Sequence, residues 1–241
     1  MDAFVEPDPE SLPTAKPFVG KTIVVRLDAH DAESPTLVQD LVFMRRLGVR
    51  PLVVHDVAQR AYGSRLVGLI NRVGGEAIAL DGAAASTIIL STDEHGRPNV
   101  HSVNAHLLTL LLQEGYIPIF SAQGTAVSGA TAPIDAADAA RALASAMHAI
   151  RLIYPSGSGG IPATGDGVIE ELTSSEALSL AAAGTLEPEL AKHLAAAAMG
   201  VRSGVEAAQL LDLSVAHAAI VELLTAQHLG TQVVSNIVLT N

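Results

Sequence analysis

Four short, continuous apolar segments recur along this 241-residue chain, with helical sequence patterns between them. Runs that lack polar–apolar alternation are typical of parallel strands buried on both faces of a sheet. The four runs are TIVVRL (22–27), PLVVH (51–55), YIPIFS (116–121) and IRLIYP (150–155). Leucine and methionine side chains spaced three and four apart predict a helix over 35–47, between the first two runs. The order strand–helix–strand favours parallel pairing.

The same alternation continues to the end of the chain. It predicts an α/β protein, a three-layer α/β/α sandwich with a mainly parallel central sheet. Further helices are expected at 64–75, 104–114, 135–149, from 174 onward, at 187–200 and at 215–227, further strands at 76–80, 205–213 and 229–235, and hairpins at 86–103 and 122–133. Prolines punctuate residues 1–20. This composition predicts a flexible leader before a single domain over 21–241.

Composition excludes several classes of protein. The chain has no cysteine, which excludes disulfides, thiolate metal sites and a cysteine nucleophile. It carries 14 Lys+Arg against 25 Asp+Glu, a net charge of −11, and no basic run, so nucleic-acid binding is not expected. No apolar run is long enough to span a membrane, and the acidic N-terminus is unlike a targeting peptide, which predicts a cytoplasmic protein. His101 and His106 have no neighbours at metal-ligand spacing, so no metal site is expected.

Three stretches carry a family resemblance: LVGLINRVGGEAIALDG (66–82), VNAHLLTLLLQEGYIPIFSAQG (103–124) and VAHAAIVELLTAQHLGTQVV (215–234). They resemble the amino-acid kinase superfamily, specifically N-acetylglutamate kinase and the kinase-like domain of N-acetylglutamate synthases, over roughly residues 20–236. The resemblance implies ATP and Mg²⁺ as cofactors and transfer of the γ-phosphate to a carboxylate. Such a transfer depends on positive groups and backbone N–H donors around the moving phosphoryl group.

The first two strand-end motifs depart from the family pattern. Where the family has a lysine and two glycines after its first strand, this chain has Arg26, Asp28 and Ala29. A carboxylate there repels phosphate, and a Cβ hinders the approach of the backbone. The second strand keeps His55 of a His-Gly-Gly-Gly motif but continues with Asp56, and the family's substrate lid is missing after it. Arg26 is expected either to pair with Asp28 or Asp56 or to contact a ligand.

The remaining motifs also differ. Asp135 takes the place of an asparagine in the family's Asn-x-Asn-Ala-Asp pattern, and Asp138 lies one residue after the position of its aspartate. Glu189 replaces the second catalytic lysine, which reverses the charge. Lys192 shares a helical face with Glu189 and is a candidate replacement, although Lys192 and His193 are most simply solvent-facing.

These departures predict a catalytically inactive pseudokinase with a regulatory or scaffolding role linked to arginine biosynthesis, as a homo-oligomer or beside another enzyme of that pathway. Two alternatives remain. One is an active N-acetylglutamate kinase that uses ATP and Mg²⁺ with Arg26, Asp138 and Lys192 in shifted roles. The other is a small-molecule sensor. His217 and Gly230 resemble part of the family's feedback-arginine site, and the glycine-rich loop 156–167 is expected to be a linker rather than a phosphate cradle.

Overall fold

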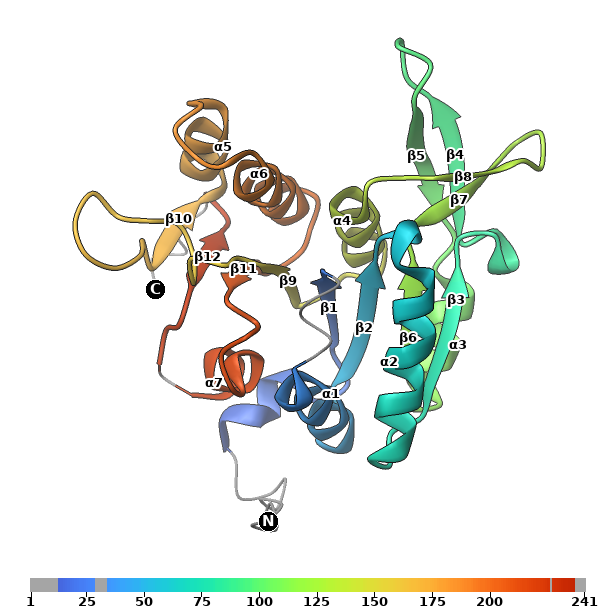
Figure 1. The fold of residues 1–241 in the computed structure, drawn as a ribbon, viewed down its shortest axis with the longest axis horizontal. Coiled ribbons are helices and arrows are strands. Elements are labelled where there is room, and N and C mark those ends of the chain that lie inside the picture. The colour runs from blue at the N-terminus through green and yellow to red at the C-terminus, as the bar shows by residue number, and fades with distance from the viewer. Residues whose placement is uncertain (1–12, 29–33, 226, 237–241) are drawn as a thin grey trace.

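A mainly parallel, eight-stranded sheet forms the centre of the computed structural model, which describes residues 13–28, 34–225 and 227–236 (Figure 1). Its strand order is β10-β12-β11-β9-β1-β2-β6-β3. The strands are β1 Thr22–Leu27, β2 Arg50–His55, β3 Ala77–Asp81, β6 Ile117–Ser121, β9 Arg151–Pro155, β10 Glu171–Thr173, β11 Ala207–Leu211 and β12 Thr231–Val234. The four apolar runs are β1, β2, β6 and β9, and they are buried on both faces, as predicted.

Helices cover both faces of this sheet, which confirms the predicted three-layer α/β/α sandwich. On one face lie α3 His106–Gln113, α4 Ala136–Ala146, α5 Ser174–Ala182 and α6 Pro188–Arg202, and on the other lie α1 Pro35–Arg46, α2 Arg60–Arg72 and α7 Ala218–Leu224 (Figure 1). Each face has its own apolar core. Several alanines on α4 and α6, such as Ala139, Ala140 and Ala197, are fully buried and let these helices approach the sheet closely.

The two predicted hairpins form a second, smaller sheet with the order β5-β4-β7-β8. It contains β4 Ile88–Thr92, β5 Pro98–Val103, β7 Gln123–Ala126 and β8 Thr131–Pro133. Both pairs are antiparallel, as expected, and β4 joins β7 in parallel. Short 3-10 helices lie at Pro13–Phe18, Val57–Gln59 and Ala84–Ser86.

The N-terminal segment differs from the predicted leader where the structure describes it. Residues 13–18 form a 3-10 helix, and Phe18 is buried in the core beneath α1 and α7. The Arg151 guanidinium also lies 5.3 Å from the centre of the Phe18 ring. A single aromatic residue therefore anchors a proline-rich segment to the domain, since burial of one such side chain is worth a few kcal/mol.

The edge of the sheet near the C-terminus also departs from the simplest parallel scheme. β11 pairs with β12 in the antiparallel sense, and the three-residue β10 continues the sheet in parallel with β12. β10 was not expected, because three residues carry too little pattern to identify a strand.

No lid lies between β2 and α2, since only residues 56–59 separate these two elements. The chain passes from His55 through one 3-10 turn directly into α2. The backbone is described throughout this part of the chain, and the predicted loss of the lid is confirmed.

Candidate functional site

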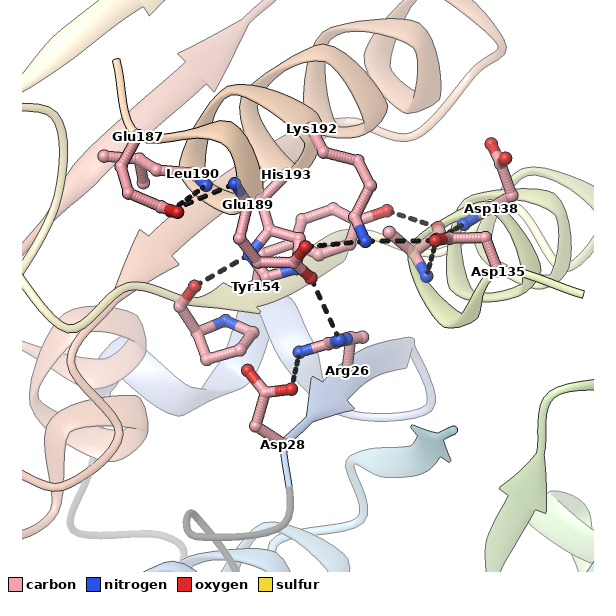
Figure 2. A network of polar contacts seen from close by, with 12 residues as sticks. Arg26, Asp28, Asp135, Asp138, Tyr154, Glu187, Glu189, Leu190, Lys192 and His193 are labelled. Atoms are coloured by element: carbon pink, nitrogen blue, oxygen red, sulfur yellow. Dashed lines mark hydrogen bonds and ion pairs between the residues drawn. The ribbon is translucent and has the colours of Figure 1, made fainter. Parts of the chain in front are cut away.

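Arg26 lies near the carboxyl end of β1, with only 6% of its side chain exposed. Its Nη1 lies 2.5 Å from Asp28 Oδ1, and its Nη2 lies 3.4 Å from Glu189 Oε1 on α6 (Figure 2). Of the two structural partners considered for Arg26, Asp28 is the one that pairs with it, whereas Asp56 Oδ1 accepts the backbone N–H of Ala58 at 2.8 Å. Ala29 lies outside the described residues.

The N-termini of α4 and α6 both approach this ion-pair cluster (Figure 2). Asp135 caps α4 by accepting the N–H groups of Ala137 and Asp138, at 2.8 and 3.3 Å. Glu187 caps α6 by accepting the N–H groups of Glu189 and Leu190, at 3.0 and 3.3 Å. A free helix N-terminus is a natural site for phosphate. Here protein carboxylates already occupy those N–H groups.

Lys192 joins the two helix ends. Its Nζ donates to Asp135 Oδ2 at 3.0 Å and lies 2.8 Å from Glu189 Oε2. Burial favours the neutral amine, but the bonds to Glu189 and Asp135 prevail and raise the pKa of Lys192. Burial likewise opposes ionisation of Asp135, and Lys192 nevertheless lowers the pKa of that carboxyl. Lys192 is therefore a charged member of the cluster, and 41% of its side chain is exposed to solvent, as predicted.

Asp138 lies outside this network. Its carboxylate pairs with Arg141 at 3.3 Å, one turn further along α4, and more than half of the side chain is exposed. The structure thus brings together Arg26, Asp28, Asp135, Glu189 and Lys192 from the candidate residues, and it leaves Asp138 at the edge.

His193 is a member of the site that the sequence did not indicate, and its predicted solvent exposure is wrong. Only 2% of this residue is exposed, and its ring stacks on Tyr154 with centroids 5.2 Å apart. Nδ1 hydrogen-bonds to the backbone oxygen of Pro155 at 3.0 Å, and Nε2 lies 3.3 Å from Glu189 Oε1. Burial, and then the charge of Arg26, lower the pKa of His193. The one signal in the sequence was its spacing of four residues from Glu189, which puts both on one helical face.

A cleft of about 360 Å³ opens beside this cluster. Carboxylates from four positions line it, with apolar side chains and the loop after β9 completing the wall. The lining carboxylates are Asp28, Glu187, Glu189 and Asp212, and the apolar residues include Pro155, Leu190 and Leu213. A negatively charged cleft of this kind repels a polyphosphate.

The glycine-rich loop after β9 uses most of its first donors within the protein. The N–H of Ser156 donates to Leu211, that of Gly159 donates to Ser156 O, and that of Gly160 donates to Ser156 Oγ. Ile161 N–H donates to Thr231 Oγ1 at 2.7 Å. These donors are not available to a phosphate, which agrees with the prediction that the loop is no phosphate cradle. The first part of the loop is held in place rather than being a flexible linker, since Ser156 and Ile161 are buried.

His55 points to the opposite face of the sheet from Arg26. Paired residues of parallel strands share a face, and Arg26 is paired with Val54, so the next residue, His55, faces α2. There its ring packs against Tyr62 and Gly63, and its Nδ1 bonds to Asp56 O at 2.8 Å. Burial lowers the pKa of His55. It lines a separate cavity of about 230 Å³ with Ser64, Asp81 and Ser121, among others.

His217 and Gly230, the candidate effector residues, each have structural partners. His217 begins α7 with a positive φ of 58°, and its Nδ1 lies 2.6 Å from Asp40 Oδ1 on α1. A Cβ on Gly230 would lie 2.2 Å from Leu210 O, so only glycine fits against β11 there. Neither residue lines the acidic cleft.

Among residues 13–28, 34–225 and 227–236, no three His, Asp or Glu side chains are grouped so as to hold a metal ion. None of the helices within those same ranges is both long and apolar enough to cross a bilayer.

Comparisons with known proteins all point to the amino acid kinase family. A sequence profile of the amino acid kinase family matches residues 24–208. The acetylglutamate kinase of Syntrophus aciditrophicus is 26% identical over 280 aligned positions, which cover 93% of this chain and 95% of that protein. That of Desulforamulus reducens is 27% identical, covering 94% and 96%. The alignment of 280 positions is longer than this chain, so this chain carries deletions relative to the first relative.

The fold is also found in a solved structure. The N-acetylglutamate synthase of Neisseria gonorrhoeae, complexed with coenzyme A and N-acetyl-glutamate, superposes with a TM-score of 0.82 at 20% identity. The match covers 98% of this chain but only 64% of the synthase chain. At that identity the likeness concerns the fold.

Proposed function

The chain belongs to the amino acid kinase family, and from that premise we propose that it is a pseudokinase related to acetylglutamate kinase. The observation that carries the proposal is the occupation of both helix N-termini at the site by protein carboxylates, Asp135 on α4 and Glu187 on α6. Phosphoryl transfer needs N–H donors and cations that are free to meet the phosphates. Here such groups are already paired within the protein.

The cations of the site support the same proposal. Arg26 is held by Asp28 and Glu189, and Lys192 by Glu189 and Asp135, so neither presents an uncompensated charge to a nucleotide. Freeing either cation for a phosphate requires breaking its present ion pairs. Phosphoryl transfer in this family also needs a lid that closes over the acceptor substrate. This chain has no lid between β2 and α2, so it lacks that element as well.

We expect the full chain, mixed with ATP, Mg²⁺ and N-acetylglutamate, to form no ADP above background. Calorimetric titration with ATP and Mg²⁺ should give no binding heat, because the cleft carries carboxylates where phosphates would lie. An active acetylglutamate kinase assayed in parallel serves as the positive control. ADP formation that depends on acetylglutamate would overturn the proposal.

One observation favours the alternative of an active acetylglutamate kinase. At the position of the family's second catalytic lysine this chain has Glu189, but one helical turn later the Nζ of Lys192 lies 3.0 Å from Asp135 Oδ2. The site therefore keeps a positive charge beside Asp135. If ADP does form, Lys192→Ala should abolish it, whereas Lys21→Ala, a change at an exposed lysine before β1, should not. Activity that survives Lys192→Ala would exclude this role for Lys192.

The proposal includes a regulatory or scaffolding role linked to arginine biosynthesis, as a homo-oligomer or with another enzyme of that pathway. Exposed apolar side chains near the β3 edge of the sheet support an association surface, namely Ile78, Leu110 and Tyr116. Light scattering should therefore give a mass above the 24.8 kDa of one chain, or a pathway enzyme should co-purify. A monomer that co-purifies with no such enzyme would contradict this role.

A further inference from the structure

The acidic cleft beside α6 has a ligand preference that can be argued from its charges. We infer that this cleft binds a small organic cation carrying a guanidinium or ammonium group on an aliphatic stem. The inference rests on the proposed function, because it requires that no nucleotide occupies the cleft. Its volume of about 360 Å³ is within the range of small-molecule sites rather than of a bare ion.

The balance of charge favours a cation. The cluster and the cleft together contain five carboxylates against two cations, which are Asp28, Asp135, Glu187, Glu189 and Asp212 against Arg26 and Lys192. The two cations already form ion pairs with members of this set. A positively charged ligand would compensate the remaining negative charge, and a phosphate would add to it.

Two of the lining carboxylates each keep one oxygen available. Asp212 uses Oδ1 to accept the N–H and the hydroxyl of Ser214, at 2.9 and 2.5 Å. Glu187 uses Oε2 for the N–H groups at the start of α6. Within the described residues, Asp212 Oδ2 and Glu187 Oε1 accept no hydrogen bond. Each is an acceptor ready for a charge-assisted bond from a ligand.

A buried atom of His193 that lacks a hydrogen bond is a second observation at this cleft. Its Nδ1 faces a backbone carbonyl, which can only accept, so Nδ1 carries the hydrogen. The ring is buried, and in the described structure Nε2 has no hydrogen bond, although it lies 3.3 Å from Glu189 Oε1. In the neutral ring Nε2 is an acceptor, so two acceptors face each other. A ligand N–H group bound at Glu189 would remove this conflict.

The rest of the cleft suits an aliphatic stem. Leu190 and Leu213 line it together with the ring of Pro155, and Leu213 is almost fully buried. A ligand with a charged head and a short hydrocarbon chain would place its head among the carboxylates and its chain on these side chains. Most small-molecule sites combine an apolar wall with a few converging polar groups in this way.

Isothermal titration calorimetry of the full chain tests the inference with agmatine and butylguanidine, and with butylurea as a neutral analogue of the same shape. Both cations should bind and the urea should not, and the affinity should fall as salt is added. Asp212→Asn should weaken binding about tenfold, the loss expected for one charge-assisted hydrogen bond. Glu94→Gln removes one negative charge from the exposed hairpin tip and should leave the affinity unchanged.

Failure of either cation to bind better than butylurea would overturn the inference, as would an equal loss of affinity in Asp212→Asn and Glu94→Gln. Failure of this inference and failure of the proposed function give different experimental results. If neither nucleotide nor cation binds, the pseudokinase proposal stands and only this inference falls. If ATP binds and is consumed with acetylglutamate, both fall.

Discussion

Neutralising both carboxylates that face Arg26, in the double variant Asp28→Asn/Glu189→Gln, is expected to lower the free energy of unfolding by roughly 3 kcal/mol. The Arg26 guanidinium is almost completely buried, so it would be left as a desolvated cation without an opposite charge. This loss lies at the low end of the range for a broken buried ion pair, because the Glu189 side chain is 46% exposed and partly screened by water. Urea unfolding at neutral pH measures the change.

The matched control is Arg26→Met, which removes the buried cation and keeps an apolar side chain of similar length. It leaves Asp28 and Glu189 with access to water, so we expect a loss of only about 1 kcal/mol. If Arg26→Met were as destabilising as the double variant, a buried cation without an opposite charge would not be the cause of the loss in the double variant.

Much of the central fold was predictable because its signals are local and strong. The strands β1, β2, β6 and β9 are continuous apolar runs, and the helices between them repeat at helical spacing. The antiparallel β11–β12 pairing and the parallel β4–β7 pairing were not predicted, because they depend on contacts between segments far apart in the chain. Phe18 shows the same limit, since its burial depends on α1 and α7.

The site was predictable where a residue's place along its element decides its partners. Asp28 follows β1 directly and pairs with Arg26, two residues before it. Lys192 lies one helical turn from Glu189 and pairs with it. Both ion pairs follow from short-range geometry. His55 illustrates where this reasoning fails. Its position at a strand end suggests proximity to Arg26, but the one-residue offset in the β1–β2 register turns it to the other face.

The helix-capping roles of Asp135 and Glu187 show that the loss of an anion-binding site cannot always be recognised from sequence. Both are ordinary N-cap residues, and their patterns alone indicate only where α4 and α6 begin. Their significance depends on the convergence of the two helix ends on one cluster (Figure 2). Side-chain carboxylates at two such ends stabilise the helices and at the same time remove the N–H groups that an anion would use.

The stability of the natural chain is expected to fall by about 3 kcal/mol, through Asp40 alone, as the pH rises from about 4 to about 6. Asp40 on α1 is buried, and burial raises the pKa of its carboxyl to about 6, although the hydrogen bond from His217 acts in the opposite direction. In this window the folded state holds a proton that the unfolded state has released, so a rise in pH favours unfolding. The measurement is urea unfolding of the natural chain and of Asp40→Asn across this range.

The informative quantity is the difference between the two proteins, because other groups titrate in both. The natural chain should lose stability relative to Asp40→Asn as the pH rises, and the difference should level off above the pKa of Asp40, about 6. His217→Phe removes the hydrogen bond that lowers the pKa of Asp40, and should move the end of this window to higher pH. A difference between the natural chain and Asp40→Asn that does not change with pH would show that Asp40 ionises at its ordinary pKa, and that contact with water or His217 compensates its burial fully.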